Sequence, residues 1–226
     1  MGSTAAEILP RVIVIFGEGG LKVGAEYGII YAYLNDEEEG FKMKKTYLSA
    51  DAYLEDEWRL AAAVRKSGWK PDILIALWRG GAPVGVSLHE FFKCSGWSVQ
   101  HLPLKCASYS GISEHGGQVV FTHGDVIFSM LRKGDKVLVV DDVFDTGKTA
   151  AAVHERIAAT GAEMRMACVY WKPEKNQTKM KPDYYVRDVG NDWIVFPHEI
   201  EDLTDEEVKE KDPVLAEILF DAREAK

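Results

Sequence analysis

The stretch VLVVDDVFDTGKTA, residues 137–150, is the feature that most constrains the fold of this chain. Its four leading apolar residues predict a strand that is covered on both faces, because a strand with one wet face would alternate apolar and polar side chains. Two adjacent aspartates follow directly, and a glycine then precedes an alanine-rich helical stretch. A buried strand that turns into a helix is typical of parallel sheets covered by helices.

The same order of strand, turn and helix recurs along the middle of the chain. Residues 72–78 form another apolar run, and RGG and a helical pattern follow it. Residues 98–106, 164–172 and 183–189 predict further strands, and residues 50–68 predict a helix. The fold class is therefore α/β, with a central, mostly parallel β-sheet flanked by helices. Ligands of such sheets bind at the carboxyl ends of the strands, where both RGG and DDVFDTGKT lie.

Composition excludes several classes of protein. The 226 residues are 46% hydrophobic, which suits a globular domain with a sizeable core. An uninterrupted apolar run of about 18 residues is missing from the sequence, which argues against a membrane partner. The start lacks the basic region and cleavage site of a signal peptide. The three cysteines, Cys94, Cys106 and Cys168, are scattered and odd in number, so we expect reduced thiols and a cytoplasmic protein.

Charge is unevenly spread along the chain. The net charge is -9 overall, made up of -4 in residues 1–42, -7 in residues 199–226 and +2 between them. Nucleic acid is therefore a poor candidate partner, whereas a small anionic ligand of the middle segment is compatible with this charge.

The charge pattern also suggests three segments. Residues 1–42 predict an N-terminal extension, either a linker or an extra hairpin at the edge of the sheet, in which residues 12–16 (VIVIF) form a strand. Residues 43–200 form the main domain, and residues 201–226 an acidic helical tail. The tail predicts a helix that ends past Pro213, with Val214, Ile218 and Leu219 as one apolar stripe, which would cover a ligand pocket or form a subunit contact.

Three kinds of site end a strand on acids. A P-loop requires glycine five residues before Gly147, and Asp142 stands there instead, so a nucleoside-triphosphatase is disfavoured. A phosphoacceptor receiver domain would carry its acid pair near the domain start, with further strands that this chain lacks. The third kind is a ribose-phosphate site, in which Asp141 and Asp142 accept hydrogen bonds from sugar hydroxyls. Backbone N–H groups at the start of the next helix would then hold a phosphate, and the residues of that phosphate nest are Asp145, Thr146, Gly147, Lys148 and Thr149.

The acid-acid-x-x-D-T-G-K-T stretch resembles the 5-phosphoribosyl-1-pyrophosphate (PRPP) motif of type I phosphoribosyltransferases. Its form is similar to that of the 6-oxopurine (hypoxanthine, guanine, xanthine) group, and the resemblance covers about residues 45–200. It implies the type I phosphoribosyltransferase fold with a hood loop, and PRPP and a purine base as substrates.

The resemblance assigns roles to the turns around this motif. It implies that Arg79, Gly80 and Gly81 hold the pyrophosphate, and that the Trp78–Arg79 peptide is cis. Ser108 and Tyr109 match the Ser-Tyr pair of the family's hood loop.

The resemblance also assigns the residues around the base. Lys172 matches the lysine that donates to the purine O6, Trp193 would stack on the purine, and the Ile194 backbone would contact the ring edge. Glu199 matches an acid near a magnesium ion or near the exocyclic group of the base, and Asp141 and Asp142 are further candidates to bind that metal through water or ribose hydroxyls.

The implied activity is a Mg²⁺-dependent transfer of the phosphoribosyl group to purine N9, as in purine salvage, with Asp145 as the general acid/base, by a homodimer or homotetramer. The alternatives are a phosphoribosyltransferase for another nucleobase, and a non-catalytic PRPP- or nucleotide-binding regulator. Two departures from the family pattern concern the pyrophosphate and metal side. His198-Glu199 replaces the usual Trp-Asp or Trp-Glu, and no arginine follows Glu199 within the next eight residues.

Overall fold

The computed structural model describes residues 22–26, 29–33, 45–108 and 119–225. The chain divides into two compact units, one of residues 1–53 and 192–226 and the other of residues 54–191. The first boundary falls within helix α1 (Ala50–Lys66). The division into an extension, a main domain and a tail stays a prediction. None of the helices in the described part of the chain has both the length and the apolarity that a membrane span requires.

The larger unit is built around a six-stranded sheet. In spatial order its strands are β6 (Val119–Thr122), β5 (Gln100–Ser108), β4 (Ile73–Trp78), β7 (Lys136–Phe144), β8 (Glu163–Trp171) and β9 (Tyr184–Asp188). All neighbouring strands are parallel except β5 and β6, which are antiparallel. The prediction of a mostly parallel α/β sheet is therefore confirmed.

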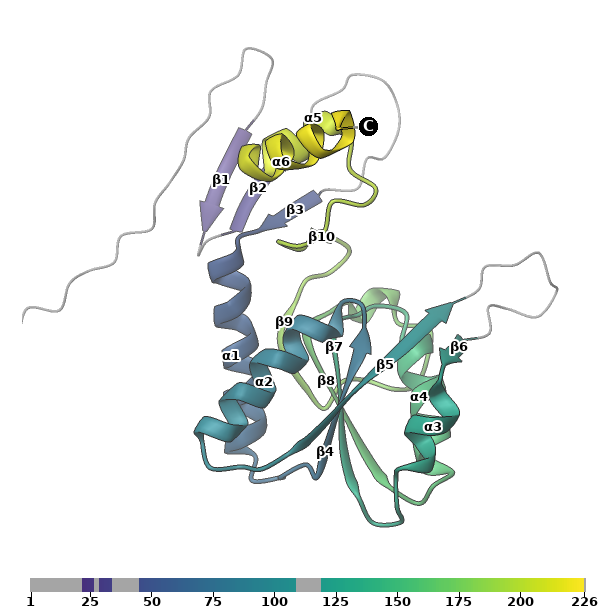
Figure 1. Ribbon diagram of the computed structural model, residues 1–226. Helices are drawn as coiled ribbons and strands as arrows, with labels where there is room; N and C mark the ends of the chain where they lie inside the picture. The colour runs from purple at the N-terminus through teal and green to yellow at the C-terminus, as the bar shows by residue number, and fades with distance from the viewer. Residues whose placement is uncertain (1–21, 27–28, 34–44, 109–118, 226) are drawn as a thin grey trace, which may run out of the picture. The chain divides into compact units, whose positions relative to one another are not determined.

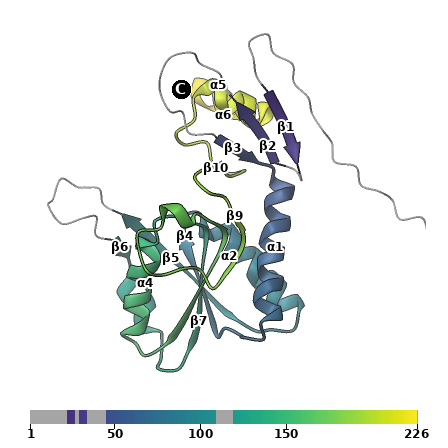
Figure 2. The ribbon, with the colours of Figure 1, turned by 180° about the vertical axis from the view of Figure 1, so that it is seen from behind.

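Helices cover both faces of this sheet. They are α1, α2 (Gly81–Cys94), α3 (Gly124–Ser129) and α4 (Lys148–Ala158), and a short 3₁₀ turn, η1 (Pro173–Lys175), follows β8. Figure 1 shows α1 and α2 against one face and α3 and α4 against the other, and Figure 2 shows the same layers from behind. Each strand of the centre is therefore covered on both sides.

Strand β7 is the centre of the core. Residues 137–140 are completely buried, as expected for an apolar run between two helical layers. Val137 and Val139 pack in the core cluster that also contains Val153 and Ile157 of α4. Full burial of a side chain of this size contributes about 1.5–3 kcal/mol. The rigid centre of the sheet therefore supports the acids that follow Val140.

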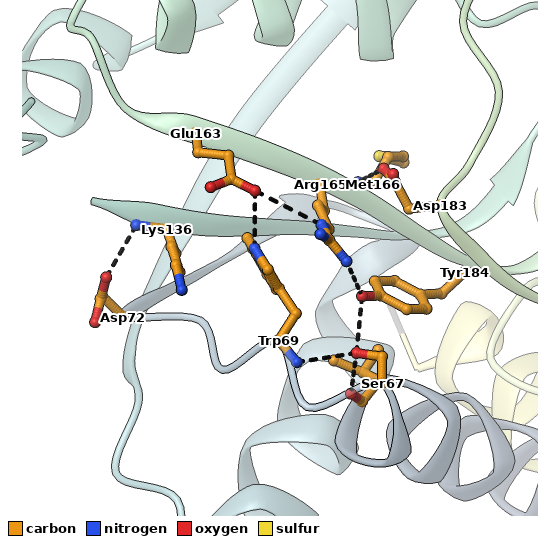
Figure 3. A network of polar contacts seen from close by, with 10 residues as sticks. Ser67, Trp69, Asp72, Lys136, Glu163, Arg165, Met166, Asp183 and Tyr184 are labelled. Atoms are coloured by element: carbon orange, nitrogen blue, oxygen red, sulfur yellow. Dashed lines mark hydrogen bonds and ion pairs between the residues drawn. The ribbon is translucent and has the colours of Figure 1, made fainter. Parts of the chain in front are cut away.

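A polar network joins the strand starts at the opposite, amino-terminal edge of the sheet (Figure 3). The Trp69 indole donates to Glu163 at 2.8 Å, and Arg165 donates to the Tyr184 hydroxyl at 2.6 Å. The Ser67 hydroxyl lies 3.0 Å from the Tyr184 hydroxyl and so joins the end of α1 to β9. These contacts connect the starts of the strands and do not involve their carboxyl ends, at which we expect a ligand to bind.

The smaller unit has a four-stranded sheet of its own. Its spatial order is β1 (Lys22–Glu26), β2 (Ile29–Tyr33), β3 (Lys45–Leu48) and β10 (Trp193–Val195). β1 and β2 are antiparallel, and β2 pairs with β3 in the same way, so the two strands form a hairpin at the edge of this separate sheet. Whether residues 1–42 are an added linker or an extra hairpin of the main domain stays a prediction. The expected strand at residues 12–16 lies outside the described residues.

The tail forms two helices, so the prediction of one helix that ends past Pro213 is wrong. Helix α5 (Asp205–Lys211) ends before Asp212, whose carboxylate accepts from the first N–H groups of α6 (Pro213–Glu224). Proline has no N–H to donate, and it favours the first turn of a new helix. Val214 and Ile218 of the predicted apolar stripe are 63% and 62% exposed, and Ala216 is the buried position of α6. The role of the stripe, as a cover for a ligand pocket or as a subunit contact, stays a prediction.

Candidate active site

The carboxyl ends of β4 and β7 bring the two predicted anion-binding stretches together. The two strands are parallel neighbours, with Ala76 opposite Val140, so RGG and the acid pair lie at the same edge of the sheet. A Cβ on Gly80 would lie 2.1 Å from an oxygen of Asp142, and a Cβ on Gly81 would lie 2.4 Å from the Val140 carbonyl oxygen. Both glycines are therefore required by close approach to β7.

The turn after β4 has the backbone that the resemblance implies. The Trp78–Arg79 peptide bond is cis, which confirms that prediction. Trp78 is 52% exposed and Arg79 is exposed as well, and α2 begins at Gly81 with no side-chain cap on its N–H groups. A helix start beside an exposed cation is suited to an anion.

The acid pair lies inside β7 rather than at its end. The strand continues to Phe144 because Val143 and Phe144 still pair with Tyr170 and Trp171 of β8. The Asp142 N–H donates to the Asp141 carboxylate at 3.1 Å, and a Gly81 backbone hydrogen bond also reaches that carboxylate. Part of the acid pair is therefore held by the same α2 start that we expect to bind pyrophosphate.

The ionisation of Asp141 is perturbed by its surroundings and by its neighbour. Burial raises the pKa of Asp141 well above its ordinary range, and the negative charge of Asp142 raises it further. The backbone hydrogen bonds from Asp142 and Gly81 act in the opposite direction. Hydrogen-bond donors or a cation brought by a ligand would relieve the repulsion between the two carboxylates.

The predicted phosphate nest begins helix α4. Gly147 has φ +76°, a left-handed conformation that favours glycine, and a Cβ there would lie 2.6 Å from the Thr178 hydroxyl and 2.8 Å from the Asn176 side-chain oxygen. The Thr146 hydroxyl accepts from the Lys148 N–H at 3.4 Å. Since the N-cap residue is glycine, no side chain of its own caps the first turn, and a phosphate can approach the N–H groups.

Asp145 and Lys172, 27 positions apart in the sequence, come together at the ends of β7 and β8. The Lys172 N–H donates to the Phe144 carbonyl at 3.0 Å, and the Lys172 ammonium lies 3.9 Å from Asp145 Oδ2. Lys172 is only 7% exposed. The other carboxylate oxygen, Asp145 Oδ1, is buried and has no hydrogen-bond partner among the described residues. An unsatisfied buried acceptor is costly, so it marks a position for a ligand donor.

The residues predicted to contact the base belong to the other unit. Trp193 is half-buried in β10, beside Lys45 of β3, and Ile194 is buried opposite Thr46. Glu199 follows in a turn in which its carboxylate accepts from the Phe196 N–H at 3.5 Å. Trp193, Ile194 and Glu199 therefore belong to one unit, and the predicted ribose and phosphate residues belong to the other.

Of the predicted hood-loop pair, the structure describes one residue. Ser108 is the last residue of β5, and Tyr109 lies outside the described residues.

Within the described part of the chain, no group of three or more histidine, cysteine or acidic side chains is arranged to hold a metal ion. The metal assignment to Glu199, Asp141 and Asp142 stays a prediction. The three cysteines are free thiols, as expected.

Sequence reasoning missed one contact to the nest. Residues 176–178, between β8 and β9, lie against Gly147, and the Gln177 N–H donates to the Thr146 carbonyl at 2.9 Å. The Asn176 side chain holds this segment together through the Met180 carbonyl and the Thr178 N–H. The signal in the sequence was the Asn-x-Thr pattern, which favours such turns but does not reveal its distant partner.

Comparisons with known sequences and structures show which family this chain resembles. The model of the phosphoribosyl transferase domain family matches residues 45–204. The hypoxanthine-guanine phosphoribosyltransferase of Lactococcus lactis is 26% identical over 157 residues, which are 68% of this chain and 81% of that protein. The adenine phosphoribosyltransferase of Frankia casuarinae is 44% identical over 62 residues, 27% of this chain and 30% of that protein. The crystal structure of a purine phosphoribosyltransferase from Pyrococcus horikoshii has a TM-score of 0.57 and 32% identity, and the match covers 71% of this chain and 97% of that one.

Proposed function

The chain belongs to the phosphoribosyl transferase domain family, in its purine phosphoribosyltransferase group, and on that premise we propose that it transfers the 5-phosphoribosyl group of PRPP to N9 of a 6-oxopurine base. The products are a purine nucleoside 5'-monophosphate and pyrophosphate.

The observation that carries this proposal is the pairing of Asp145 with Lys172. A 6-oxopurine presents O6 and N7 side by side on one edge, and adenine replaces the O6 acceptor with an amino donor. An ammonium 3.9 Å from a carboxylate offers a donor to O6 beside an acceptor for a proton on N7. The same ammonium would face the amino group of adenine as a second donor, and a pyrimidine has no N7. This chemistry favours a 6-oxopurine over adenine and over a pyrimidine.

The PRPP side follows from the neighbouring groups. The ribose hydroxyls donate to Asp141 and Asp142, and the 5'-phosphate accepts from the N–H groups at the start of α4. The pyrophosphate lies at Gly80 and Gly81, beside the cation of Arg79.

In the reaction, the bond from C1' to the pyrophosphate oxygen breaks and the leaving group keeps the electron pair, while N9 forms the new bond to C1'. The proton on N7 passes to Asp145, so that charge does not build up on the purine. The carboxylates of Asp141 and Asp142 stabilise the positive charge that develops on the sugar.

Magnesium is part of the proposal, and the donor set is compatible with it. The acid pair offers oxygen ligands only, and Mg²⁺ prefers one or two carboxylates together with water and substrate phosphates over a cage made by protein alone. When bound, the ion neutralises charge on the pyrophosphate. Asp141 and Asp142 would contact it directly, through water or through the ribose hydroxyls, and the resemblance adds Glu199.

A substitution of Asp145 tests the proton transfer. In Asp145→Asn the proton acceptor is lost, so kcat with PRPP, Mg²⁺ and hypoxanthine should fall by roughly 10²- to 10³-fold, while the KM for PRPP changes only a few-fold. Asp125→Asn is the control, since this aspartate lies on the exposed face of α3, where it pairs with Arg156. An unchanged kcat in Asp145→Asn would mean that another group accepts the proton.

A further inference from the structure

The tail helix α5 contacts the segment that we expect to bind the purine, residues 193–199, and these contacts lie within one compact unit. The family match ends at residue 204, just before α5 begins at Asp205. These contacts therefore come from a part of the chain that the family model does not cover.

Lys211, the last residue of α5, holds the turn after β10. Its ammonium donates to the Phe196 carbonyl at 2.6 Å, to the Pro197 carbonyl at 3.1 Å, and also to the Glu199 carbonyl. Three donors on one ammonium thus meet three carbonyls within four residues of chain. Burial lowers the pKa of Lys211, and Glu199 partly offsets this effect. A half-buried ammonium that donates to three carbonyls fixes the path of the backbone.

Glu207, one helical turn earlier, holds the other end of the segment through Lys45. Its Oε1 accepts from the Lys45 ammonium at 2.7 Å, and both side chains are largely buried, at 16% and 21% exposure. The Lys45 ammonium lies 5.2 Å from the centre of the Trp193 ring. The cation therefore lies over one face of the indole and helps to fix the orientation of the ring.

Residues 207 and 211 are four positions apart, so they lie on the same face of α5, on which Val208 is also buried. The other carboxylate oxygen of Glu207 accepts from the Thr204 N–H at 2.9 Å and so completes a capping box at the start of the helix. This cap fixes the helix that carries both contacts.

We propose that Glu207 and Lys211 are positioning residues for the purine: Glu207 sets the Trp193 ring through Lys45, and Lys211 fixes the backbone of residues 196–199. The inference rests on the proposed function, because it assumes that this segment binds the base. It gives the acidic tail a role in base affinity, separate from PRPP binding.

Two substitutions with matched controls on α5 test this role. Lys211→Met removes the donors at similar length, and Glu207→Gln removes the charge that pairs with Lys45 but keeps an acceptor for the capping box. Lys209→Met and Glu206→Gln are the controls, since both side chains are exposed on the same helix. Each variant is assayed for the KM of hypoxanthine and the KM of PRPP.

We expect the KM for hypoxanthine to rise by about tenfold in Lys211→Met and Glu207→Gln, because a shift of about 1 Å in a binding segment has effects of this order or larger. The KM for PRPP should stay within about twofold, and the controls should resemble the wild type. Lys211→Arg, which keeps donors for the carbonyls, should restore most of the base affinity. An unchanged KM for hypoxanthine in both test variants, or an equal rise in both KM values, would overturn the inference.

Amide hydrogen exchange separates this inference from the proposed function. Peptides that cover residues 193–199 should exchange faster in Lys211→Met than in Lys209→Met, and peptides that cover residues 141–149 should not change. If the wild type fails to transfer phosphoribose to any purine, the proposed function is wrong, and equal exchange in the two lysine variants would then overturn the positioning role as well.

Discussion

Gly80→Ala tests whether the turn after β4 and the acid pair of β7 form one site. The backbone of Gly80 has φ −61°, which alanine adopts without strain, so the only cost is space. The new Cβ would lie 2.1 Å from Asp142 Oδ2, whereas ordinary contacts begin at 3.4 Å. The carboxylate must therefore withdraw by about 1.3 Å from the position at which we expect it to bind ribose. Displacements of about 1 Å cost roughly 100-fold in rate.

We therefore expect kcat/KM for PRPP to fall by about 100-fold in Gly80→Ala, with a loss of about 1–3 kcal/mol in the free energy of unfolding from overpacking. Initial rates at varied PRPP and urea unfolding measure the two quantities. Gly96→Ala, at the other end of α2, is the control, because Gly96 has φ +83° and open space around it. This control should lose about 1 kcal/mol of stability and keep full activity. Normal kcat/KM in Gly80→Ala would refute the shared site.

Two further predictions concern buried acids. Burial and, after it, the charge of Asp142 raise the pKa of Asp141, so the folded chain holds this proton more tightly than the unfolded chain does. The tighter proton binding stabilises the fold below about pH 4, and this stabilisation is lost as pH rises through the raised pKa. In urea unfolding at pH 7.5, the free energy of unfolding of Asp141→Asn should therefore exceed that of the wild type by about 1.4 kcal/mol for each unit of pKa shift, although the variant should be inactive. This gain should shrink towards pH 4. Equal free energies of unfolding for variant and wild type at both pH values would contradict the repulsion between the two carboxylates. Asp56, 3% exposed, accepts from the Tyr170 hydroxyl at 2.8 Å and pairs with Arg187. Asp56→Asn should lower the free energy of unfolding by about 3 kcal/mol. If this substitution costs no more than Glu55→Gln, the control at an exposed position, the buried ion pair does not stabilise the fold.

The positions of the residues that we propose to bind PRPP could be predicted because their signals are local. An apolar run followed by acids predicts a buried strand and a polar end, and two glycines after a neighbouring strand predict a turn that approaches another backbone. Parallel pairing of β4 with β7 then brings the two stretches together without further information. The cis peptide at Trp78–Arg79 followed from the resemblance, since nothing in those two residue types requires it.

The tail and the buried acids could not be predicted in the same way. Asp212-Pro213 is a recognisable helix start, and greater weight on it would have divided the tail into two helices. The role of Lys211 depends on carbonyls 12 to 15 residues earlier, and a charged helix usually faces solvent. Asp56 is buried because of Tyr170, 114 positions away, and no periodicity in a single helix reveals such a partner.

The most direct test of the central claim is a competition between bases. The purified chain is incubated with PRPP, Mg²⁺ and equal amounts of hypoxanthine, guanine, xanthine, adenine and uracil, and the nucleotides are identified by mass spectrometry together with released pyrophosphate. We predict 6-oxopurine nucleoside 5'-monophosphates in a one-to-one ratio with pyrophosphate, and no AMP or UMP. Formation of AMP or UMP alone, or of no nucleotide, would contradict the account.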